Sequence, residues 1–427
     1  MNKKIWNTSG VKVSDEISSF LAGEDIELDN SIFIYDIDAT IAHIKGLQSI
    51  SILKKNEFNR LNKSLKELRK KFLEGSFKLT KKYEDCHSAI EFYLTKELGD
   101  LGKKVHTGRS RNDQVLVAMR LFAKNNLHDF KKLNQSIAKT FLQMANKYEH
   151  IPMPGYTHLQ RAMPSSWGLW FSSYAESFID NIDLINSTIE WIDSNPLGSA
   201  AGYGVALPLD RKTTTKELGF KRMQLNSLYT QNSRGKYEMQ VINTLKQSML
   251  DVRKFAWDMS LFMSQEFNLL NIDKAYLTGS SIMPNKQNPD VIEILRANYS
   301  ILAGQASELE NIISLPSGYH RDLQLTKRSL VSSFNISLKS LGILPKLIKS
   351  IKVNKKNSLE YIDNEMKMTD KVYALVKQGI PFRDAYNKVK NSNDMSQFSE
   401  TNIANYSEGS PGNLKLNVLE KRLSKQR

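Results

Sequence analysis

The sequence contains one cysteine, Cys86, among its 427 residues. A single cysteine excludes a framework of internal disulfides and favours a reducing compartment. The sequence also lacks any apolar run near the roughly 20 residues that a membrane-spanning helix needs. No apolar stretch follows Lys3 and Lys4, so the amino terminus does not have the pattern of a secretory signal. We therefore expect a cytoplasmic protein.

Proline and glycine are scarce as well, at 11 and 21 residues, and five long stretches are nearly free of both. Within these stretches apolar residues recur every three to five positions, which is the spacing of a helix with one buried face. Alternation of apolar and polar residues, the pattern of a strand, is scarce. The sequence therefore predicts an all-α fold with a central bundle of five long helices at 114–151, 165–194, 236–267, 289–314 and 323–344.

The length of the chain is sufficient for two or three domains. We expect an N-terminal, mostly helical domain at 1–105, the central bundle at 106–350 and a short C-terminal helical domain at 351–427. Helices of this length carry more apolar surface than one chain can easily cover, and this favours an oligomer.

Basic residues outnumber acidic ones by 60 to 45, which gives a formal net charge of +15. Such a charge is compatible with binding to nucleic acid through its phosphates. The lysine pairs, however, are spread along the chain, at 54–55, 103–104, 131–132 and 355–356 among other positions, and no single basic arm or RNA-binding signature stands out. We favour a lysine-rich solvated surface and keep nucleic-acid binding as an alternative.

The polar segment 278–289, with the sequence TGSSIMPNKQNP, interrupts the helical pattern. Gly279 and Pro284 break regular structure, so we predict a loop. Asn288 can cap the helix that follows, and Asp290 adds an acid to its first turn. Hydroxyl, amide and ammonium groups beside the start of a helix are suited to bind an anion. A structural loop with a capped helix behind it is the alternative.

Three other breaks between the predicted helices are also polar. The segment 106–114, HTGRSRNDQ, holds two arginines, each of which can bind a carboxylate through two hydrogen bonds. The segment 155–160, GYTHLQ, holds a histidine, and the segment 315–324, LPSGYHRDLQ, holds a tyrosine and another histidine. Any one of them could by itself be an exposed turn.

In order and spacing, the four breaks together resemble a known family. The segment 278–289 is similar to the signature G-S-S-x-M-P-x-K-x-N-P of the fumarase/aspartase superfamily of lyases, and the other three resemble the form found in the argininosuccinate lyase family. The resemblance extends over roughly residues 30–390. It implies an all-α three-domain chain, a homotetramer with a twenty-helix core, and active sites that combine residues from three subunits.

The resemblance also implies a reversible β-elimination of argininosuccinate to L-arginine and fumarate, the last step of arginine biosynthesis, without a metal or an organic cofactor. In the family the first serine of the signature pair is the base, here Ser280, and the histidine of Thr-His-Leu-Gln is its acid partner, here His158. A glutamate in the helix after the signature orients that histidine, and Glu293 matches it. By motif match the substrate-binding residues are Arg111, Asn112, Thr157, Lys286, Asn288, Tyr319, Gln324 and Lys327.

These residue types suit the chemistry because the proton leaves a carbon next to a carboxylate, and the doubly charged intermediate needs positive charge and N–H groups around it. A serine hydroxyl becomes a base only where such groups stabilise its alkoxide, and Ser281 is the alternative base. Cys86 is not expected to be a nucleophile, since this elimination needs no covalent intermediate. For His87 and His106, supporting and purely structural roles both remain open.

The sequence departs from the family at Gly23, near which a substrate-binding serine is expected. A backbone N–H could replace the missing hydroxyl. The alternative functions are another lyase of the superfamily, such as adenylosuccinate lyase, and a catalytically silent homologue like the lens crystallins of this family.

Overall fold

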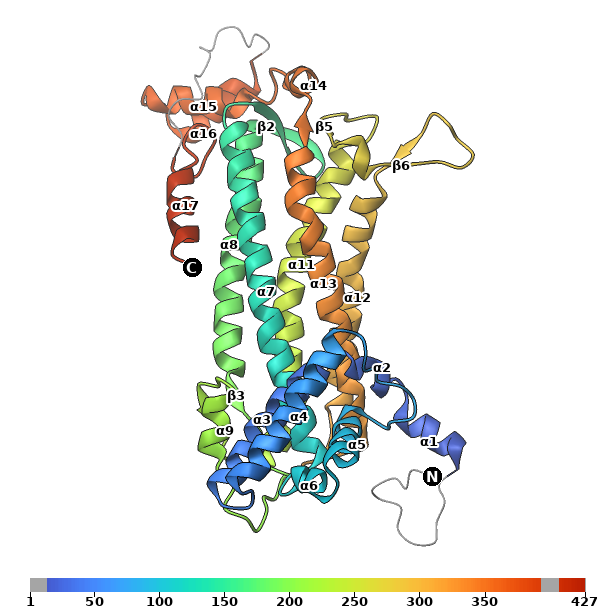
Figure 1. Cartoon of the computed structure of the whole chain (residues 1–427). Coiled ribbons are helices and arrows are strands. Elements are labelled where there is room, and N and C mark those ends of the chain that lie inside the picture. Colours follow the sequence, from blue (N-terminus) through green and yellow to red (C-terminus); the bar gives the residue numbers. More distant parts are fainter. Residues whose placement is uncertain (1–13, 393–406, 427) are drawn as a thin grey trace. The chain divides into compact units, whose positions relative to one another are not determined.

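The computed structural model describes residues 14–392 and 407–426, and helices dominate these ranges (Figure 1). Before the long helices the chain forms α1 (Asp15–Ala22), α2 (Asp25–Asp29), α3 (Phe33–Ser49), α4 (Lys55–Leu73), α5 (Cys86–Leu98), α6 (Asp100–Lys103) and a 3-10 turn at Lys104–His106. Within the described ranges, no helix has both the length and the apolar character that crossing a bilayer requires.

Five long helices follow, namely α7 (Arg111–Lys147), α8 (Trp167–Ile192), α11 (Lys236–Phe262), α12 (Asp290–Ile312) and α13 (Thr326–Ser350). Each corresponds to one of the helices predicted from apolar spacing, so the all-α prediction is confirmed. Helix α7 has 37 residues and is therefore about 55 Å long at roughly 1.5 Å per residue.

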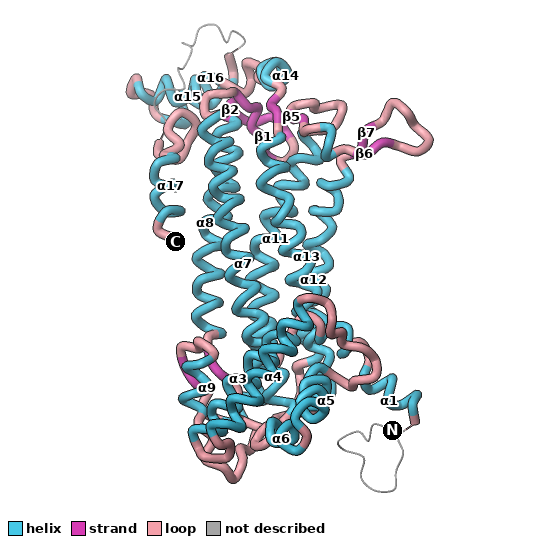
Figure 2. Tube along the Cα trace, viewed as in Figure 1, coloured by secondary structure: helices cyan, strands magenta, loops and turns pink. Residues whose placement is uncertain are grey.

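Shorter elements connect and follow these helices. The helical ones are α9 (Arg211–Glu217), α10 (Ser227–Asn232), α14 (Lys355–Glu360), α15 (Met368–Lys377), α16 (Phe382–Lys390) and α17 (Leu416–Ser424), with 3-10 turns at Lys274–Tyr276 and Arg321–Leu325. The strands are β1 (Pro152–Thr157), β2 (Gln160–Ser166), β3 (Ser194–Asn195), β4 (Arg222–Met223), β5 (Leu270–Asn271), β6 (Thr278–Gly279), β7 (Gln287–Asn288) and β8 (Lys352–Val353). These strands pair only two by two, as β1–β2, β3–β4, β5–β8 and β6–β7 (Figure 2).

The chain divides into two compact units. The first unit combines Met1–His128, Thr188–Asn243 and Gly304–Phe334, and the second combines Asp129–Ser187, Thr244–Ala303 and Asn335–Arg427. Each of the five long helices contributes residues to both units. The three domains predicted from the sequence follow the course of the chain instead, and their boundaries stay a prediction.

The core of the first unit includes the interface between α3 and α4. Phe33 and Ile37 on α3, and Leu61, Leu65 and Leu68 on α4, are fully buried. Their spacing of three and four residues puts the members of each set on one face of their helix. Burial of each such side chain contributes about 1.5–3 kcal/mol, so this interface stabilises the short helices that carry the N-terminal part of the candidate site.

The core of the second unit is rich in aromatic residues. The ring of Phe141 stacks on that of Tyr174 at 5.5 Å and meets that of Phe255 edge-on at 5.4 Å. The indole N–H of Trp170 and the hydroxyl of Tyr174 both donate hydrogen bonds to Asp258, at 2.8 and 2.7 Å. Buried Trp and Tyr side chains need such partners for their polar atoms, and Asp258 supplies both from α11.

One element absent from the sequence-based prediction is the antiparallel hairpin β1–β2, in which Pro152 pairs with Ser166 and Thr157 with Gln160. The hairpin contains Pro154 and Pro164, although proline cannot donate to a sheet ladder. In a two-stranded hairpin both strands are edges, so proline is tolerated. The hairpin places the turn 158–159 at its tip.

Candidate active site

Five of the residues predicted to bind substrate line one pocket in the first unit, namely Arg111, Asn112, Tyr319, Gln324 and Lys327. The pocket has a cavity volume of about 200 Å³, which is room for several water molecules at about 30 Å³ each. Charged side chains that the motifs did not indicate complete its wall, namely Asp25, Glu84, Asp85, Arg234 and Arg321. Because both charge signs are present, the pocket suits a ligand that itself carries both.

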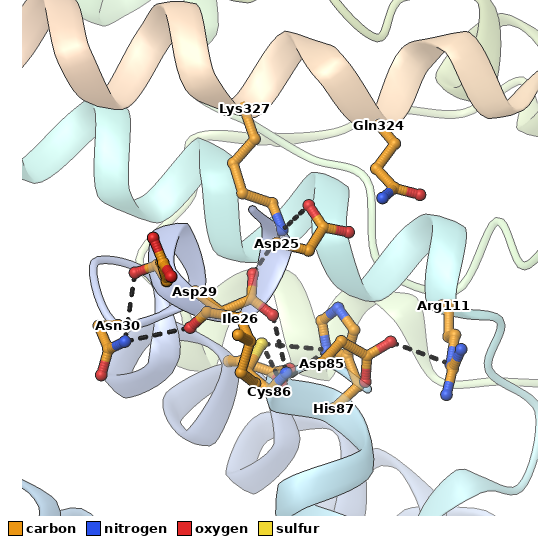
Figure 3. Close-up of polar contacts among 12 residues, drawn as sticks. Asp25, Ile26, Asp29, Asn30, Asp85, Cys86, His87, Arg111, Gln324 and Lys327 are labelled. Atoms are coloured by element: carbon orange, nitrogen blue, oxygen red, sulfur yellow. Dashed lines mark hydrogen bonds and ion pairs between the residues drawn. The ribbon is translucent and has the colours of Figure 1, made fainter. Parts of the chain in front are cut away.

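Lys327 lies in the first turn of α13 and contacts two carboxylates. Its ammonium forms an ion pair with Asp25 at 3.0 Å and a second, shorter one with Asp29 (Figure 3). The side chains of Lys327 and Asp29 are 3% and 0% exposed. Burial by itself would lower the pKa of Lys327, but Asp29 and Asp25 outweigh burial and raise it. The lysine is therefore held in its charged form.

Arg111, the first residue of α7, is also neutralised within the chain. Its guanidinium pairs with Glu84 at 3.1 Å and with Asp85 at 3.2 Å, and it donates a hydrogen bond to Ser88 Oγ at 2.6 Å. Asp85 is at the same time the N-cap of α5, where it accepts the backbone N–H of Ser88 at 2.7 Å. The preference of aspartate for a helix N-cap thus places a carboxylate beside this arginine.

The 3-10 turn Arg321–Leu325 connects the pocket to α1. The side-chain amide of Gln324 donates to the carbonyl oxygen of Leu21 at 2.9 Å, and the guanidinium of Arg321 donates to the same oxygen at 3.1 Å. The ring centre of Tyr319 lies 5.7 Å from the guanidinium of Arg234, which is within the range of a cation–π interaction. These contacts position the predicted substrate-binding side chains of the turn.

A buried cluster of Asp36, Cys86 and His87 lies beside Asp29. The described residues contain this one group of three side chains whose potential metal-binding atoms come within 4.8 Å of one another. His87 Nδ1 lies 2.7 Å from Asp36 Oδ2, which is a hydrogen-bond distance. Two ligands of one tetrahedral ion, bound at about 2.0–2.1 Å, would be more than 3 Å apart. The geometry therefore favours a structural hydrogen-bonded cluster.

Two pKa shifts describe the same cluster. Burial by itself would lower the pKa of His87, but the carboxylate of Asp36 outweighs it, and the pKa is raised. Burial, followed by the charges of Asp29 and Asp36, raises the pKa of the Cys86 thiol. A thiol kept protonated is a poor nucleophile, in agreement with the exclusion of Cys86 from the chemistry.

Asp113 has no role in the motif-based assignment, yet it organises the start of α7. It is fully buried and accepts hydrogen bonds from the backbone N–H groups of Ser110, Gly198 and Ala200, at 2.9, 2.9 and 3.0 Å. Burial raises the pKa of Asp113 to about 6, against the opposing effect of these donors. Asp113 therefore attaches the loop at 196–200 to the first turn of α7, which also contains Arg111.

In the second unit, the signature segment forms the short hairpin β6–β7, in which residues 278–279 pair with 287–288. At its turn, Ser280 Oγ accepts hydrogen bonds from the backbone N–H groups of Met283 at 3.1 Å and Ile282 at 3.4 Å. Two N–H groups directed at this oxygen would favour its negatively charged form. Ile282 and Met283 themselves are 82% and 45% exposed.

Lys286 and Asn288 continue this hairpin, and Lys286 is exposed. The next helix, α12, begins at Asp290, and its first backbone hydrogen bonds reach the carbonyl of Pro289. The predicted cap at Asn288 is therefore wrong by one residue. Proline has no N–H to lose at a helix start, so it is tolerated in the cap position.

Thr157 and His158 lie at the tip of the hairpin β1–β2, where both are exposed. His158 and Leu159 form its two-residue turn and have positive φ angles of 55° and 58°. Such angles suit the tight turn of a hairpin but are strained for residues other than glycine, and this kind of strain is concentrated at functional sites. Glu293 is exposed in the first turn of α12, and its pairing with His158 stays a prediction.

Gly23 stands near the position at which the family resemblance implies a substrate-binding serine. Gly23 has a positive φ of 50° and does not line the pocket, whereas Ala22 and Asp25 on either side of it do. The motif-based reasoning missed Asp25 and Arg234. The sequence signals that could have indicated them are the acidic pair after Gly23 and the glycine that follows Arg234.

Comparison with known proteins agrees with this fold and this set of segments. The sequence model of a family described as Lyase matches residues 19–303. The fold is similar to that of EDDS lyase solved in complex with formate, with a TM-score of 0.81 at 21% identity, covering 98% of this chain and 92% of that one. It is also similar to the class II fumarase of Schistosoma mansoni, with a TM-score of 0.72 at 16% identity, covering 89% and 93%. The class of protein is therefore a lyase.

Curated relatives resolve the family further. The chain is 47% identical over 423 residues to the argininosuccinate lyase of Xanthomonas oryzae pv. oryzae (strain PXO99A), covering 98% of each protein. It is 46% identical over 426 residues to the argininosuccinate lyase of Xylella fastidiosa (strain Temecula1 / ATCC 700964), covering 99% of this chain and 96% of the relative. The chain belongs to the argininosuccinate lyase family, and the resemblance found in the four polar segments is confirmed.

Proposed function

We propose that this chain is a carbon–nitrogen lyase that cleaves argininosuccinate reversibly to L-arginine and fumarate, the final step of arginine biosynthesis. The observation that carries the proposal is the 47% identity to an argininosuccinate lyase over 98% of both proteins. The pocket of mixed charge in the first unit supports it, because argininosuccinate combines three carboxylates with an ammonium and a guanidinium.

Ser280 is the proposed base, which removes the proton from the carbon next to a substrate carboxylate. The N–H groups of Ile282 and Met283 support this role because they donate to its oxygen, and the ammonium of Lys286 adds positive charge to the same turn. Lys286, Asn288 and Thr157 would bind the carboxylates of the succinate end, on which negative charge accumulates in the intermediate.

His158 is the proposed acid partner, which supplies a proton to the departing guanidinium nitrogen. A positioned histidine contributes typically 10²–10⁴-fold to a reaction of this kind. Glu293 would orient the ring and raise its basicity. Arg111, Asn112, Tyr319, Gln324 and Lys327 would bind the rest of the substrate.

We further propose a homotetramer whose active sites combine residues of several subunits. Apolar side chains on the long helix α12 support it, since Ile294 and Ile301 are 61% and 48% exposed in the single chain and would need a covering partner. Sedimentation of the purified protein tests this proposal, and a monomer at micromolar concentration would contradict it. The predicted cytoplasmic location, and the predicted absence of nucleic-acid binding, stay predictions that cell fractionation and a binding assay at moderate salt can test.

The experiment that tests the function is the appearance of fumarate by ultraviolet absorbance when purified protein meets argininosuccinate. Adenylosuccinate, aspartate and malate serve as matched substrates of related lyases, and a chelator in a parallel assay tests the expectation that no metal is needed. Signal with argininosuccinate alone would establish the proposal. Signal with only one of the other substrates would support the proposed elimination reaction but show that the substrate is not argininosuccinate. A folded protein without any signal would support the silent homologue.

A further inference from the structure

Arg161 on strand β2 connects the hairpin β1–β2 to a segment 200 positions later in the chain. One guanidinium nitrogen, Nη1, pairs with Asp363 Oδ2 at 2.9 Å and donates a hydrogen bond to the carbonyl oxygen of Tyr361 at 3.3 Å. Asp363 is itself fixed, because its Oδ1 accepts the backbone N–H of Met366 at 3.0 Å, and Met366 is 2% exposed. All these residues belong to the second unit. The segment 361–363 is therefore an anchor segment for the hairpin.

The other strand of the hairpin reaches the same anchor segment through a row of aromatic rings. Tyr156 on β1 lies opposite Arg161 in the strand pairing. Its ring meets that of Phe267 edge-on at 5.8 Å, and the ring of Phe267 lies 6.4 Å from that of Tyr361. The hydroxyl of Tyr361 donates a hydrogen bond to the carbonyl oxygen of Glu266 at 2.6 Å. Both strands are thus attached to the anchor segment, β2 by an ion pair and β1 by ring contacts.

These contacts lie close to the turn that carries His158. Strand β2 begins at Gln160, so one residue separates Arg161 from the turn formed by His158 and Leu159. Both turn residues are exposed and have positive φ angles. A two-stranded hairpin is only marginally stable by itself, and strained backbone angles persist only where the surrounding structure determines them. The attachment of Arg161 to the anchor segment is therefore suited to determine the direction of the His158 ring.

We infer that Arg161 is a positioning residue for the reaction, which holds the His158 turn through its contacts with Asp363 and the carbonyl of Tyr361. The inference rests on the proposed function, since it takes His158 as the acid partner. A proton donor must lie within hydrogen-bond reach of the atom it serves, and a misplacement of about 1 Å can lower a rate about 10²-fold. The side chains of Arg161 and Asp363 are 44% and 34% exposed, and an ion pair of such exposure contributes little to global stability. Loss of Arg161 should therefore affect turnover far more than stability.

Steady-state kinetics of Arg161→Gln test the inference. We expect kcat for argininosuccinate to fall about 10–50-fold and KM to change less than about threefold, because a misplaced proton donor is lost from the transition state and not from substrate binding. Arg161→Lys should recover most of kcat, since one nitrogen makes both contacts and an ammonium can replace it. Arg422→Gln is the matched control in the second unit. Arg422 pairs with Glu176 and Asp180 at 3.2 and 2.7 Å and is 37% exposed, and its loss should change kcat less than about twofold.

Two further measurements separate positioning from a general structural effect. In the His158→Asn background, Arg161→Gln should lower kcat less than about twofold further, because no proton donor is left to misplace. Hydrogen exchange followed by mass spectrometry reports the hairpin directly and needs no turnover. Peptides that cover 152–166 should exchange about 10-fold faster in Arg161→Gln, while peptides from α17 should be unchanged. The thermal midpoint should stay within about 2 °C of that of the unaltered protein.

An unchanged kcat in Arg161→Gln would overturn the inference, and so would an equal fold loss with and without His158. If Arg161→Gln does not fold by circular dichroism, Asp363→Asn removes the same ion pair from the other side, and the same results are expected of it. Asparagine keeps an oxygen for the N–H of Met366. Fumarate release by the unaltered protein together with unaffected variants rejects the inference alone. Without fumarate release the proposed function fails, while faster exchange of 152–166 would still support the anchor segment and unchanged exchange would reject it.

Discussion

The pocket of the first unit and the two hairpins of the second differ in how far the side chains proposed to act there are buried and paired within one chain. In the pocket, Lys327 is 3% exposed and its ammonium already contacts two carboxylates. In the hairpins, His158 and Lys286 are exposed, and Ile282 beside Ser280 is 82% exposed. The pocket has internal counter-charges that hold its side chains in place. In the hairpins, by contrast, His158 and Lys286 are exposed, and the turn at His158 and Leu159 has strained backbone angles.

This difference indicates a division of work. Recognition of a charged ligand depends on side chains fixed in advance, because ordering them during binding would reduce the affinity. The groups proposed to move protons are instead presented on exposed turns, where a subunit of the proposed tetramer or a bound substrate would complete their surroundings. The following changes test this division, from the largest expected effect to the smallest.

The strongest test concerns Ser280. We expect Ser280→Ala to reduce turnover of argininosuccinate about 10⁴-fold, because a base that acts in the transition state is removed. Thermal unfolding should be unchanged, since the side chain lies in an exposed turn. Fumarate absorbance and differential scanning calorimetry measure the two effects. Ser281→Ala is the matched control and should keep most of the activity; the reverse pattern would move the base role to Ser281.

The second test concerns the stability of the pocket. Lys327→Met should reduce the free energy of unfolding by about 3–5 kcal/mol, because it leaves the buried Asp29 without its counter-charge. The exposed neighbour Arg328 provides the control, and Arg328→Met should cost less than about 1 kcal/mol. Urea unfolding followed by circular dichroism measures both. Equal effects of the two changes would show that the pocket is not stabilised by its internal ion pairs.

The third test concerns His158 and Glu293. His158→Asn should lower turnover about 10²–10³-fold through the loss of the proton donor. If Glu293 acts by orienting this ring, Glu293→Gln should lower activity less, and the double variant should be no slower than His158→Asn alone. Steady-state kinetics of the three variants and the unaltered protein form the cycle. Additive losses would reject the predicted pairing.

The smallest expected effect is a pH dependence in the first unit. Burial, Arg109 and Arg111 lower the pKa of His106 to about 4, against about 6.5 in an unfolded chain. Between these values the unfolded chain binds a proton that the folded chain does not, so stability falls as pH is lowered from about 6.5 to 4. Because His106 is partly exposed, we expect a contribution of only about 1–2 kcal/mol.

His106→Gln should therefore lose about 1–2 kcal/mol less stability between pH 7 and 4.5 than the unaltered protein. Urea midpoints at pH 7, 5.5 and 4.5 measure the difference. The control is His150→Gln, at an exposed position in the second unit, which should follow the unaltered protein at each pH. The same acid sensitivity in all three proteins would contradict the assignment to His106.

Apolar spacing and motif residues were sufficient to predict much of this protein. The five long helices follow from side chains at helical intervals, because a helix in water is stable only where one face is buried. The set Arg111, Asn112, Tyr319, Gln324 and Lys327 was predicted from two segments about 200 residues apart, and the fold brings all five to one cavity. The hairpin β1–β2 was missed because its residues were interpreted only as a polar break between two helices, and two short edge strands that contain proline show no clear strand pattern.

The sequence by itself determined the all-α class, the long helices and the family, since each depends on local spacing or on short segments of the chain. Only the tertiary structure decided which charges are neutralised. Asp25 and Asp29 contact Lys327 across about 300 positions of sequence, and nothing in the residues next to Lys327 indicates these two partners. Electrostatic energy depends on distance and burial in the folded chain, and these quantities exist only once distant segments have packed together.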